Sequence, residues 1–281
     1  MVTVITKAMK KFTLSIIVLI CITTTSFSQK KEKVIKYKKI FYKNQTIENA
    51  DVKITIDDAV ATPIGIKFKV SIINKTSDYI IFKPSECEFK IKDTNVKPVE
   101  KWLVIGPNDK DWRIVDIKGN YVIPENFEFL MAGFYKVPLD SKGNITPDFK
   151  LPASDREFKT GGFTVTLDGF KKATAKTDAK FNVSYSGDKI GIIETSKVAV
   201  KMPDGKEFAN YLTDKPMIFD KGTTDNFKVA WKDIPIASGD MQKVEMIILW
   251  RDAIKDVTPL QIPSINLTIL IDKELSMAKG R

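Results

Sequence analysis

The chain of 281 residues contains no histidine. Without an imidazole it cannot form a Ser-His-Asp triad, a Cys-His pair or a histidine-ligated zinc or haem site. It also lacks a glycine-rich phosphate loop. A carboxylate pair or a Ser-Lys arrangement could still support hydrolysis, but spacing alone identifies neither. We therefore expect a protein that is not an enzyme and that carries no cofactor.

Cysteine is also scarce, with only Cys21 and Cys87 in the chain. Cys21 lies in an N-terminal apolar run that we expect to be removed, so Cys87 would remain alone and no intrachain disulfide could form. The residues around Cys87 predict a strand position that faces the core, where a thiol is inert. Stability must then come from apolar burial, and about 250 residues suffice for two domains of ordinary size.

Residues 1–28 are typical of a secretory signal peptide. Lys10 and Lys11 precede the apolar run 12–22, and small serines flank Phe27 as at a cleavage site. The run is too short to span a bilayer comfortably. Bulky Ile20 before Cys21 disfavours a lipoprotein, and Met9 could serve as the true start. We expect an exported protein, periplasmic or extracellular.

The formal net charge of +10 is concentrated near the start of the chain. In the arm at 29–48, residues 29–43 contain seven lysines against Glu32 alone, whereas the residues from Asn44 onward sum to only +1. The lysines are Lys30, Lys31, Lys33, Lys36, Lys38, Lys39 and Lys43. Nucleic-acid binding by the folded body therefore loses its main support. We expect the arm to be a solvated, partly disordered tail, with electrostatic contact to an anionic membrane surface as the alternative.

Most of the remaining chain alternates between apolar and polar residues. Residues 64–72 place Ile64, Ile66, Phe68, Val70 and Ile72 on one face, and residues 264–272 show the same period of two. Residues 243–250 predict a central strand. Pro203, Asp204 and Gly205 have the residue types of a tight hairpin. These patterns predict an all-β architecture.

The strand pattern also repeats weakly along the chain. The segments 54–57 and 68–71 resemble 165–168 and 181–184, at offsets of 111 to 113 residues. We interpret the chain as two copies of one domain, at 49–151 and 161–273, joined by a linker at 152–160. A single larger sandwich remains the alternative.

Residues 67–97 resemble the extracellular immunoglobulin-like domains of bacterial envelope proteins. The shared pattern is a strand, Asn-x-Thr/Ser, an aromatic and apolar strand, Pro-Ser and a further strand; residues 195–206 are similar to the third strand and hairpin of that family. The leader and the Lys/Ile/Asn-rich composition look like those of Bacteroidetes proteins. The resemblance implies two tandem immunoglobulin-like antiparallel β-sandwich domains, and it bears on fold more than on function.

Aromatic residues are the best candidates for a ligand surface. Trp102 and Trp112 bracket a polar stretch that includes Asp109 and Asp111. An exposed indole beside carboxylates suits sugar binding, although core burial of both rings is the expectation we favour. Trp231 and Trp250 lie in apolar strands and are expected in the core. The acidic clusters at 57–58 and 108–111 fall short of a calcium loop, so we expect no metal site.

Three functions are compatible with these features. The first is a non-catalytic envelope or extracellular module that binds a protein or a glycan. The second is a periplasmic assembly chaperone, which would present a long unpaired edge strand. The third is a secreted hydrolase, which would hold two carboxylates about 5 to 10 Å apart in a cleft. The first agrees best with the missing histidine.

Overall fold

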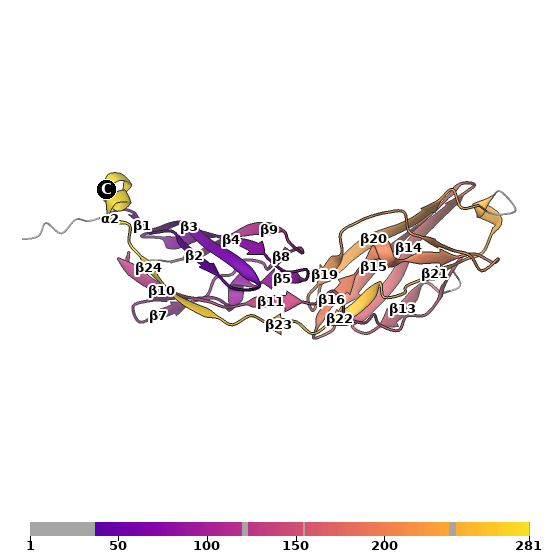
Figure 1. The fold of residues 1–281 in the computed structure, drawn as a ribbon, viewed down its shortest axis with the longest axis horizontal. Helices are drawn as coiled ribbons and strands as arrows, with labels where there is room; N and C mark the ends of the chain where they lie inside the picture. Colours follow the sequence, from indigo (N-terminus) through magenta and orange to yellow (C-terminus); the bar gives the residue numbers. More distant parts are fainter. Residues whose placement is uncertain (1–36, 120–122, 154, 236–239, 281) are drawn as a thin grey trace, which may run out of the picture. The chain divides into compact units, whose positions relative to one another are not determined.

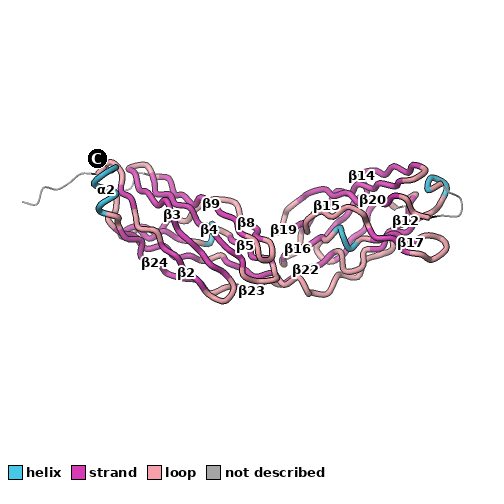
Figure 2. Tube along the Cα trace, turned by 45° about the horizontal axis from the view of Figure 1, so that its top comes forward, coloured by secondary structure: helices cyan, strands magenta, loops and turns pink. Residues whose placement is uncertain are grey.

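The computed structural model describes residues 37–119, 123–153, 155–235 and 240–280. Antiparallel strands dominate these residues (Figure 2), and α2 (Lys273–Lys279) is the one α-helix among them. The expected all-β fold is confirmed. No helix in these ranges is long and apolar enough to cross a membrane.

The first group of sheets contains three sheets. Their strands are β1 (Ile40–Phe41), β2 (Gln45–Glu48), β3 (Val52–Thr62), β4 (Gly65–Asn74), β5 (Tyr79–Phe82), β6 (Glu88–Ile91), β7 (Thr94–Val96), β8 (Leu103–Ile105), β9 (Lys110–Lys118), β10 (Asn126–Met131), β11 (Phe134–Val137), β23 (Leu260–Gln261) and β24 (Ile265–Leu270). The strand orders are β1-β3-β4-β9 with β2 also on β3, β24-β10-β6-β7 and β23-β11-β5-β8. A 3₁₀ turn, η1 (Pro84–Glu86), joins β5 to β6.

The second group of sheets repeats this strand order. Its elements are β12 (Phe149–Leu151), β13 (Glu157–Thr160), β14 (Phe163–Ala173), β15 (Lys176–Tyr185), β16 (Ile190–Ile193), η2 (Thr195–Lys197), β17 (Ala199–Lys201), β18 (Glu207–Ala209), β19 (Met217–Phe219), β20 (Thr224–Lys232), η3 (Met241–Lys243), β21 (Met246–Leu249) and β22 (Ile254–Val257). The orders are β13-β14-β15-β20, β12-β21-β17-β18 and β19-β16-β22. In both groups a long hairpin, β3-β4 or β14-β15, pairs with a nine-residue strand, β9 or β20.

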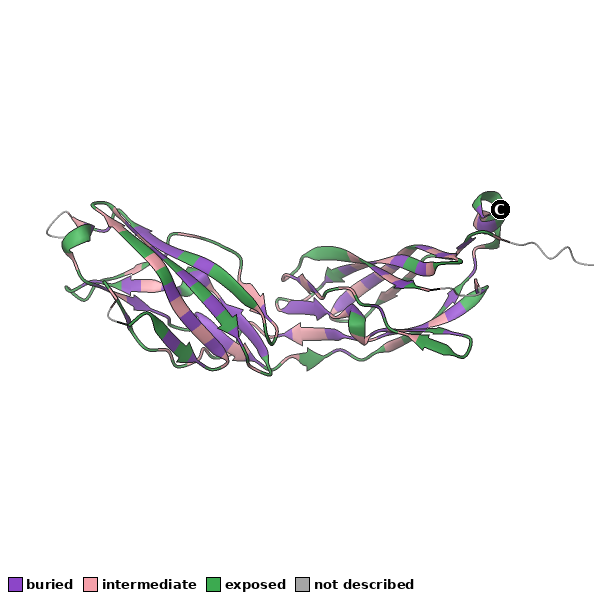
Figure 3. Cartoon of the chain, turned by 180° about the vertical axis from the view of Figure 1, so that it is seen from behind, coloured by how far each residue is buried: buried purple, intermediate pink, exposed green. Residues whose placement is uncertain are grey.

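Burial follows the expected alternation along the long strands, visible as stripes in Figure 3. Ile66, Phe68, Val70 and Ile72 are at most 1% exposed. Ile64 was expected on the same face, but it is 73% exposed because the strand begins only at Gly65, after the hairpin turn. The hairpin at Gly205 forms as expected between β17 and β18, with φ +85°.

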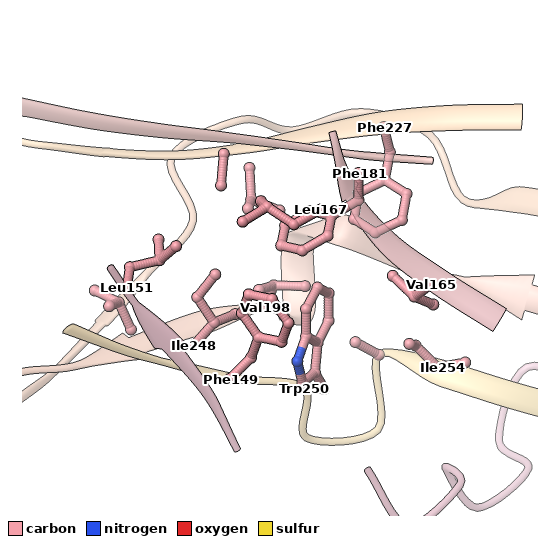
Figure 4. Packing of buried hydrophobic residues seen from close by; sticks show 14 of the residues in the cluster. Phe149, Leu151, Val165, Leu167, Phe181, Val198, Phe227, Ile248, Trp250 and Ile254 are labelled. Atoms are coloured by element: carbon pink, nitrogen blue, oxygen red, sulfur yellow. The ribbon is translucent and has the colours of Figure 1, made fainter. Parts of the chain in front are cut away.

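Aromatic rings fill the core of each group. In the first, Phe68 lies 4.9 Å from Phe129 and 5.2 Å from Phe89, measured between ring centroids. In the second, Trp250 lies 5.2 Å from Phe181 in a cluster shown in Figure 4. Trp231 and Trp250 are buried, as predicted.

Cys87 is fully buried between η1 and β6. Its Sγ donates a hydrogen bond to the carbonyl of Ala132 at 3.2 Å, and burial raises the pKa of the thiol to about 12. A thiol that stays protonated is a poor nucleophile. The expected core position of Cys87 is confirmed.

The C-terminal segment belongs to the first group of sheets. The expected boundary at 161–273, which assigned this segment to the second domain, is therefore wrong. β24 pairs with β10 along six residues, from Asn126 opposite Leu270 to Met131 opposite Ile265. β23 pairs with β11, and α2 packs against β1 (Figure 1). Two segments therefore connect the groups, 138–148 and 258–259, and the second group is inserted between β11 and β23.

The other expected boundaries also shift. Residues 149–151, assigned to the first copy, form β12 and pair with β21, and the expected linker at 152–160 contains β13, which pairs with β14. Part of the expected tail is structured as well. Ile40 and Tyr42 are buried, and the Tyr42 hydroxyl donates to the carbonyl of Pro124 at 2.7 Å.

The remainder of the arm is divided between described and undescribed residues. The compact unit begins at Lys38, and the amides of Lys38 and Lys39 donate to the carbonyl of Gly280. Lys43 is exposed beside β1. The expected signal peptide at 1–28 lies outside the described residues, as do Lys30, Lys31, Lys33 and Lys36.

A smaller apolar cluster draws on both groups of sheets. It contains Tyr79, Ile81, Val137, Ile190, Ile192 and Val257. Beside it, Lys255 is only 1% exposed; its Nζ lies 2.8 Å from Glu194 Oε1 and donates to the carbonyl of Leu139 at 2.6 Å. A buried ammonium needs such partners, because an unpaired buried charge is costly. The pair thus fixes β16 and β22 to the connecting segment at Leu139.

The assignment of β24 to the first group yields a stability prediction. Ile269 of β24 and Ile248 of β21 are both fully buried, so an aspartate at either position buries an unpaired charge. We expect Ile269→Asp to destabilise the first group and Ile248→Asp the second, each by several kcal/mol, about the cost of that burial.

Two local reporters distinguish these outcomes. In a Cys21→Ser background, the rate of thiol labelling reports exposure of Cys87 in the first group. With Trp102→Phe and Trp112→Phe added, fluorescence reports only Trp231 and Trp250 in the second. Ile269→Asp should accelerate labelling and leave the fluorescence midpoint unchanged. The reverse result would show that β24 belongs to the second group.

Candidate functional site

Asn74, at the end of β4, fixes the loop before β9. Its buried Nδ2 donates to the carbonyls of Asp78 and Gly106 at 2.7 and 2.8 Å. Its Oδ1 accepts from the amide and the hydroxyl of Thr76 at 2.9 and 2.8 Å. Since both amide protons and the acceptor are used, this Asn-x-Thr triplet serves as a structural clamp.

The loop held by Asn74 carries Asp109, and the start of β9 carries Asp111; both are expected ligand residues. Asp109 and Asp111 line a pocket of about 610 Å³, within the size range of small-molecule sites. Tyr79, Ile105 and Ile218 contribute apolar surface, and Lys215 contributes a cation. One oxygen of each aspartate is engaged by the following backbone amide, Lys110 N at 2.8 Å and Trp112 N at 2.7 Å.

Trp112 lies outside this pocket, on the outer face of the sheet formed by β2, β3, β4 and β9. It is 55% exposed, and Lys69 Nζ lies 5.6 Å from the centre of its ring, within cation-π range. Ile73 and Ile114, on the neighbouring positions of the same face, are also exposed. The expectation that Trp112 belongs to the core is therefore wrong.

Trp102 is half-buried and lies apart from Trp112. It packs against the cluster shared by the two groups, and Lys83 Nζ lies 5.6 Å from its ring. Its carbonyl accepts from the Arg113 guanidinium at 3.1 Å. Trp102 is thus closer to the core position that the sequence favoured than to an open ligand platform.

The structure does not bring the four expected residues into one site. The polar stretch that they bracket is only partly a loop, because β9 already begins at Lys110. Successive residues of a strand point to opposite faces, so Asp111 and Trp112 diverge. The sequence offered no separate signal for where that strand begins.

A row of hydroxyl groups beside Trp112 was missed from the sequence. Thr46, Thr55, Ser71 and Trp112 are consecutive cross-strand partners on β2, β3, β4 and β9. The hydroxyls of Thr46 and Thr55 lie 3.3 Å apart. We call these four residues with Lys69, Ile73 and Ile114 the Trp112 face. Period-two patterning places each residue on a face but does not identify its cross-strand neighbour, so the row could not be read from the sequence.

A carboxyl pair lies at the edge of the same sheet. Glu100 Oε1 accepts from the amide of Asp116 on β9 at 2.7 Å. Burial of the Glu100 carboxyl, followed by its hydrogen bond with the Asp116 side chain, raises the pKa of Glu100 to about 7. Glu100 is therefore bound to Asp116 directly and is not held across a cleft from it, as the separated carboxylates of glycoside hydrolysis would be.

Glu100 also closes the backbone edge of β9, and Asn210 does the same in the second group. Asn210 Oδ1 accepts from the amide of Ala230 on β20 at 2.9 Å. Asp225 accepts from the amide of Asn226, as Asp111 does from that of Trp112. These bonds occupy part of each nine-residue edge, which leaves fewer donors for an added strand.

Among the described residues, no cluster of three or more cysteine, aspartate or glutamate side chains could hold a metal ion. The acidic stretches at 57–58 and 108–111 instead form local contacts. Asp57 lies 3.9 Å from Lys69, and Asp109 and Asp111 accept from backbone amides.

No protein-family model matches the chain, and no curated protein matches it. Among solved structures, a conserved domain protein from Bacillus anthracis is 11% identical, with a TM-score of 0.21 over 81% of this chain and 90% of that chain. AerE from Microcystis aeruginosa is 13% identical, with a TM-score of 0.10 over 80% of this chain and 99% of that one. These scores are too low to carry any inference about fold or function.

The raised pKa of Glu100 predicts a pH dependence of stability. Because the folded pKa is raised from 4.5 to about 7, folding favours the protonated form. The stabilisation is complete below about pH 4.5 and is lost as the pH rises through 7. Glu100→Gln keeps the acceptor for the Asp116 amide but removes this dependence.

We therefore expect urea-unfolding free energies of the wild type to fall, relative to Glu100→Gln, between pH 4.5 and 8. Glu125→Gln, which changes an exposed glutamate, should follow the wild type. Parallel curves for the wild type and Glu100→Gln would show that folding does not raise the pKa of Glu100.

Proposed function

We propose that the protein is an exported, non-catalytic module that binds a protein or a glycan at the cell envelope. In this proposal the two groups of sheets are immunoglobulin-like β-sandwich domains, in the broad sense of paired antiparallel layers, with the second inserted into the first and not following it in tandem. The antibody order places the second and third strands in different sheets. Here β3 pairs with β4 and β14 with β15, so the likeness concerns architecture and not strand order.

The exposure of Trp112 carries the proposal. A large aromatic ring that remains in solvent on a regular sheet face gives up the free energy of burial, and such residues recur at binding surfaces. The Lys69 ammonium lies near the Trp112 ring, but more than half of the Trp112 surface remains exposed to solvent. The adjoining hydroxyl row adds hydrogen-bonding groups to a rigid platform.

Export is supported by the leader at 1–28 and by the chemistry of Cys87. A single buried thiol with a raised pKa resists oxidation and disulfide exchange outside the cytoplasm. The lysines between Lys30 and Lys43 would add electrostatic contact with an anionic membrane surface. Among the described residues, Lys38, Lys39 and Lys43 are the exposed members of that set.

The two alternative functions gain less support. Strand addition by a chaperone needs free backbone groups, whereas Glu100 and Asn210 occupy amides on the long edge strands β9 and β20. A retaining or inverting hydrolase needs two carboxylates separated across a cleft, whereas the Glu100 carboxyl is hydrogen-bonded to the amide of Asp116.

Photo-crosslinking in cells tests the proposal. A benzoyl-phenylalanine at Ile114, beside Trp112, should form adducts with an envelope component. The same residue at Leu260 on β23 should form none, although Leu260 is 53% exposed. Trp112→Ala should abolish the Ile114 adduct and leave the melting temperature within about 2 °C, since the ring is exposed. Equal adducts at both positions would refute a specific surface.

A further inference from the structure

The second group of sheets exposes a different surface at the position equivalent to the Trp112 face. Two rows of uncharged polar side chains cross β14, β15 and β20. One row is Thr164, Ser184 and Thr224, and the other is Thr166, Asn182 and Asn226. We call these six residues the polar face. They border a shallow hollow of about 450 Å³.

The side chains of the polar face have few partners within the protein. Across the described residues, Thr166 forms the one side-chain hydrogen bond of the six, from its Oγ1 to Glu157 Oε2 at 3.3 Å. Asn182 and Asn226 are each followed on their strands by a buried residue, Val183 or Phe227, so the asparagine side chains lie on the opposite, exposed face. Donors and acceptors are therefore held on a rigid sheet and remain available to a ligand.

Charge excludes ionic ligands as the natural occupant of this face. Its six residues carry no charge, and the lysines that follow on the same face are paired. Lys180 lies 3.1 Å from Asp168, and Lys228 lies 3.1 Å from Asp178. The margin of the polar face carries charges of both signs, on Glu157, Lys159 and Asp225. A neutral ligand complements such a surface, whereas a polyanion or polycation gains no net attraction.

The pattern of groups indicates a repeating ligand. Neighbouring strands lie about 4.8 Å apart, so hydroxyl and amide groups recur at that spacing across three strands. The face lacks the apolar centre that protein interfaces usually have. We propose that the polar face binds a neutral polysaccharide chain through hydrogen bonds from Asn182, Asn226 and the neighbouring hydroxyls. This inference rests on the proposed binding function, and it names the ligand class and a second contact surface.

Affinity electrophoresis of the full chain tests the inference. The gels contain hydroxyethyl cellulose, xyloglucan, mannan or dextran as neutral polymers, and alginate as the polyanion. At least one neutral polymer should retard the wild type. Asn182→Ala/Asn226→Ala should bind that polymer about tenfold more weakly, because four hydrogen-bonding groups are removed. Asn95→Ala, which changes an exposed asparagine on β7, should bind as the wild type.

Several outcomes would overturn the inference. They are no retardation in any neutral gel, retardation by alginate alone, or unchanged binding by the double variant with an unaltered circular-dichroism melt. A face that docks a protein instead would give no retardation by polymers. Loss of binding in Trp112→Ala with normal binding by the double variant would overturn the polar face and leave the proposed function intact. The converse result would support the polar face and count against the Trp112 face.

Discussion

The pairing of β24 with β10 is the constraint on which the first group of sheets depends. β10 carries Phe127 and Phe129 into the core, and its outer edge is completed only by residues 265–270. In the second group the equivalent edge, on β21, is completed by β12, which is the first strand of that group. One copy of the strand order is therefore closed by a local segment and the other by the end of the chain. The first group cannot form all of its sheet pairs until the second has been synthesised.

The closure of strand edges directs recognition toward the sheet faces. Among the described strands, β9 and β20 are the longest with one unpaired side. In each, the side chain of a residue before the preceding short strand, β8 or β19, accepts an amide at the equivalent position. The two groups use different side chains to occupy the unpaired amide of the edge strand, a carboxyl at Glu100 and an amide at Asn210. Only the carboxyl can titrate, so this edge contact is sensitive to pH in the first group and not in the second, even though the geometry is repeated.

Much of the fold was predictable from local pattern. Alternation at 66–72, the turn at Gly205 and the burial of Cys87, Trp231 and Trp250 follow from residue type and period. The partner of β24 was not predictable, because alternation assigns a face to each residue and says nothing of the neighbouring strand. Ile40 and Tyr42 were missed because the lysines around them masked a short buried strand. The Trp112 face was missed because a polar stretch that resembled a loop is partly β9.

The two copies differ most where packing constrains them least. Thr55 and Thr166 occupy the same position, and each forms a cross-strand hydrogen bond at 3.3 Å, with Thr46 and with Glu157. Along the same rows, Trp112 stands where the second copy has Asn226. Inward residues at alternate positions are apolar in both, because each must fill a core. Outward positions carry no such demand, so one scaffold presents a stacking surface in one copy and a hydrogen-bonding surface in the other.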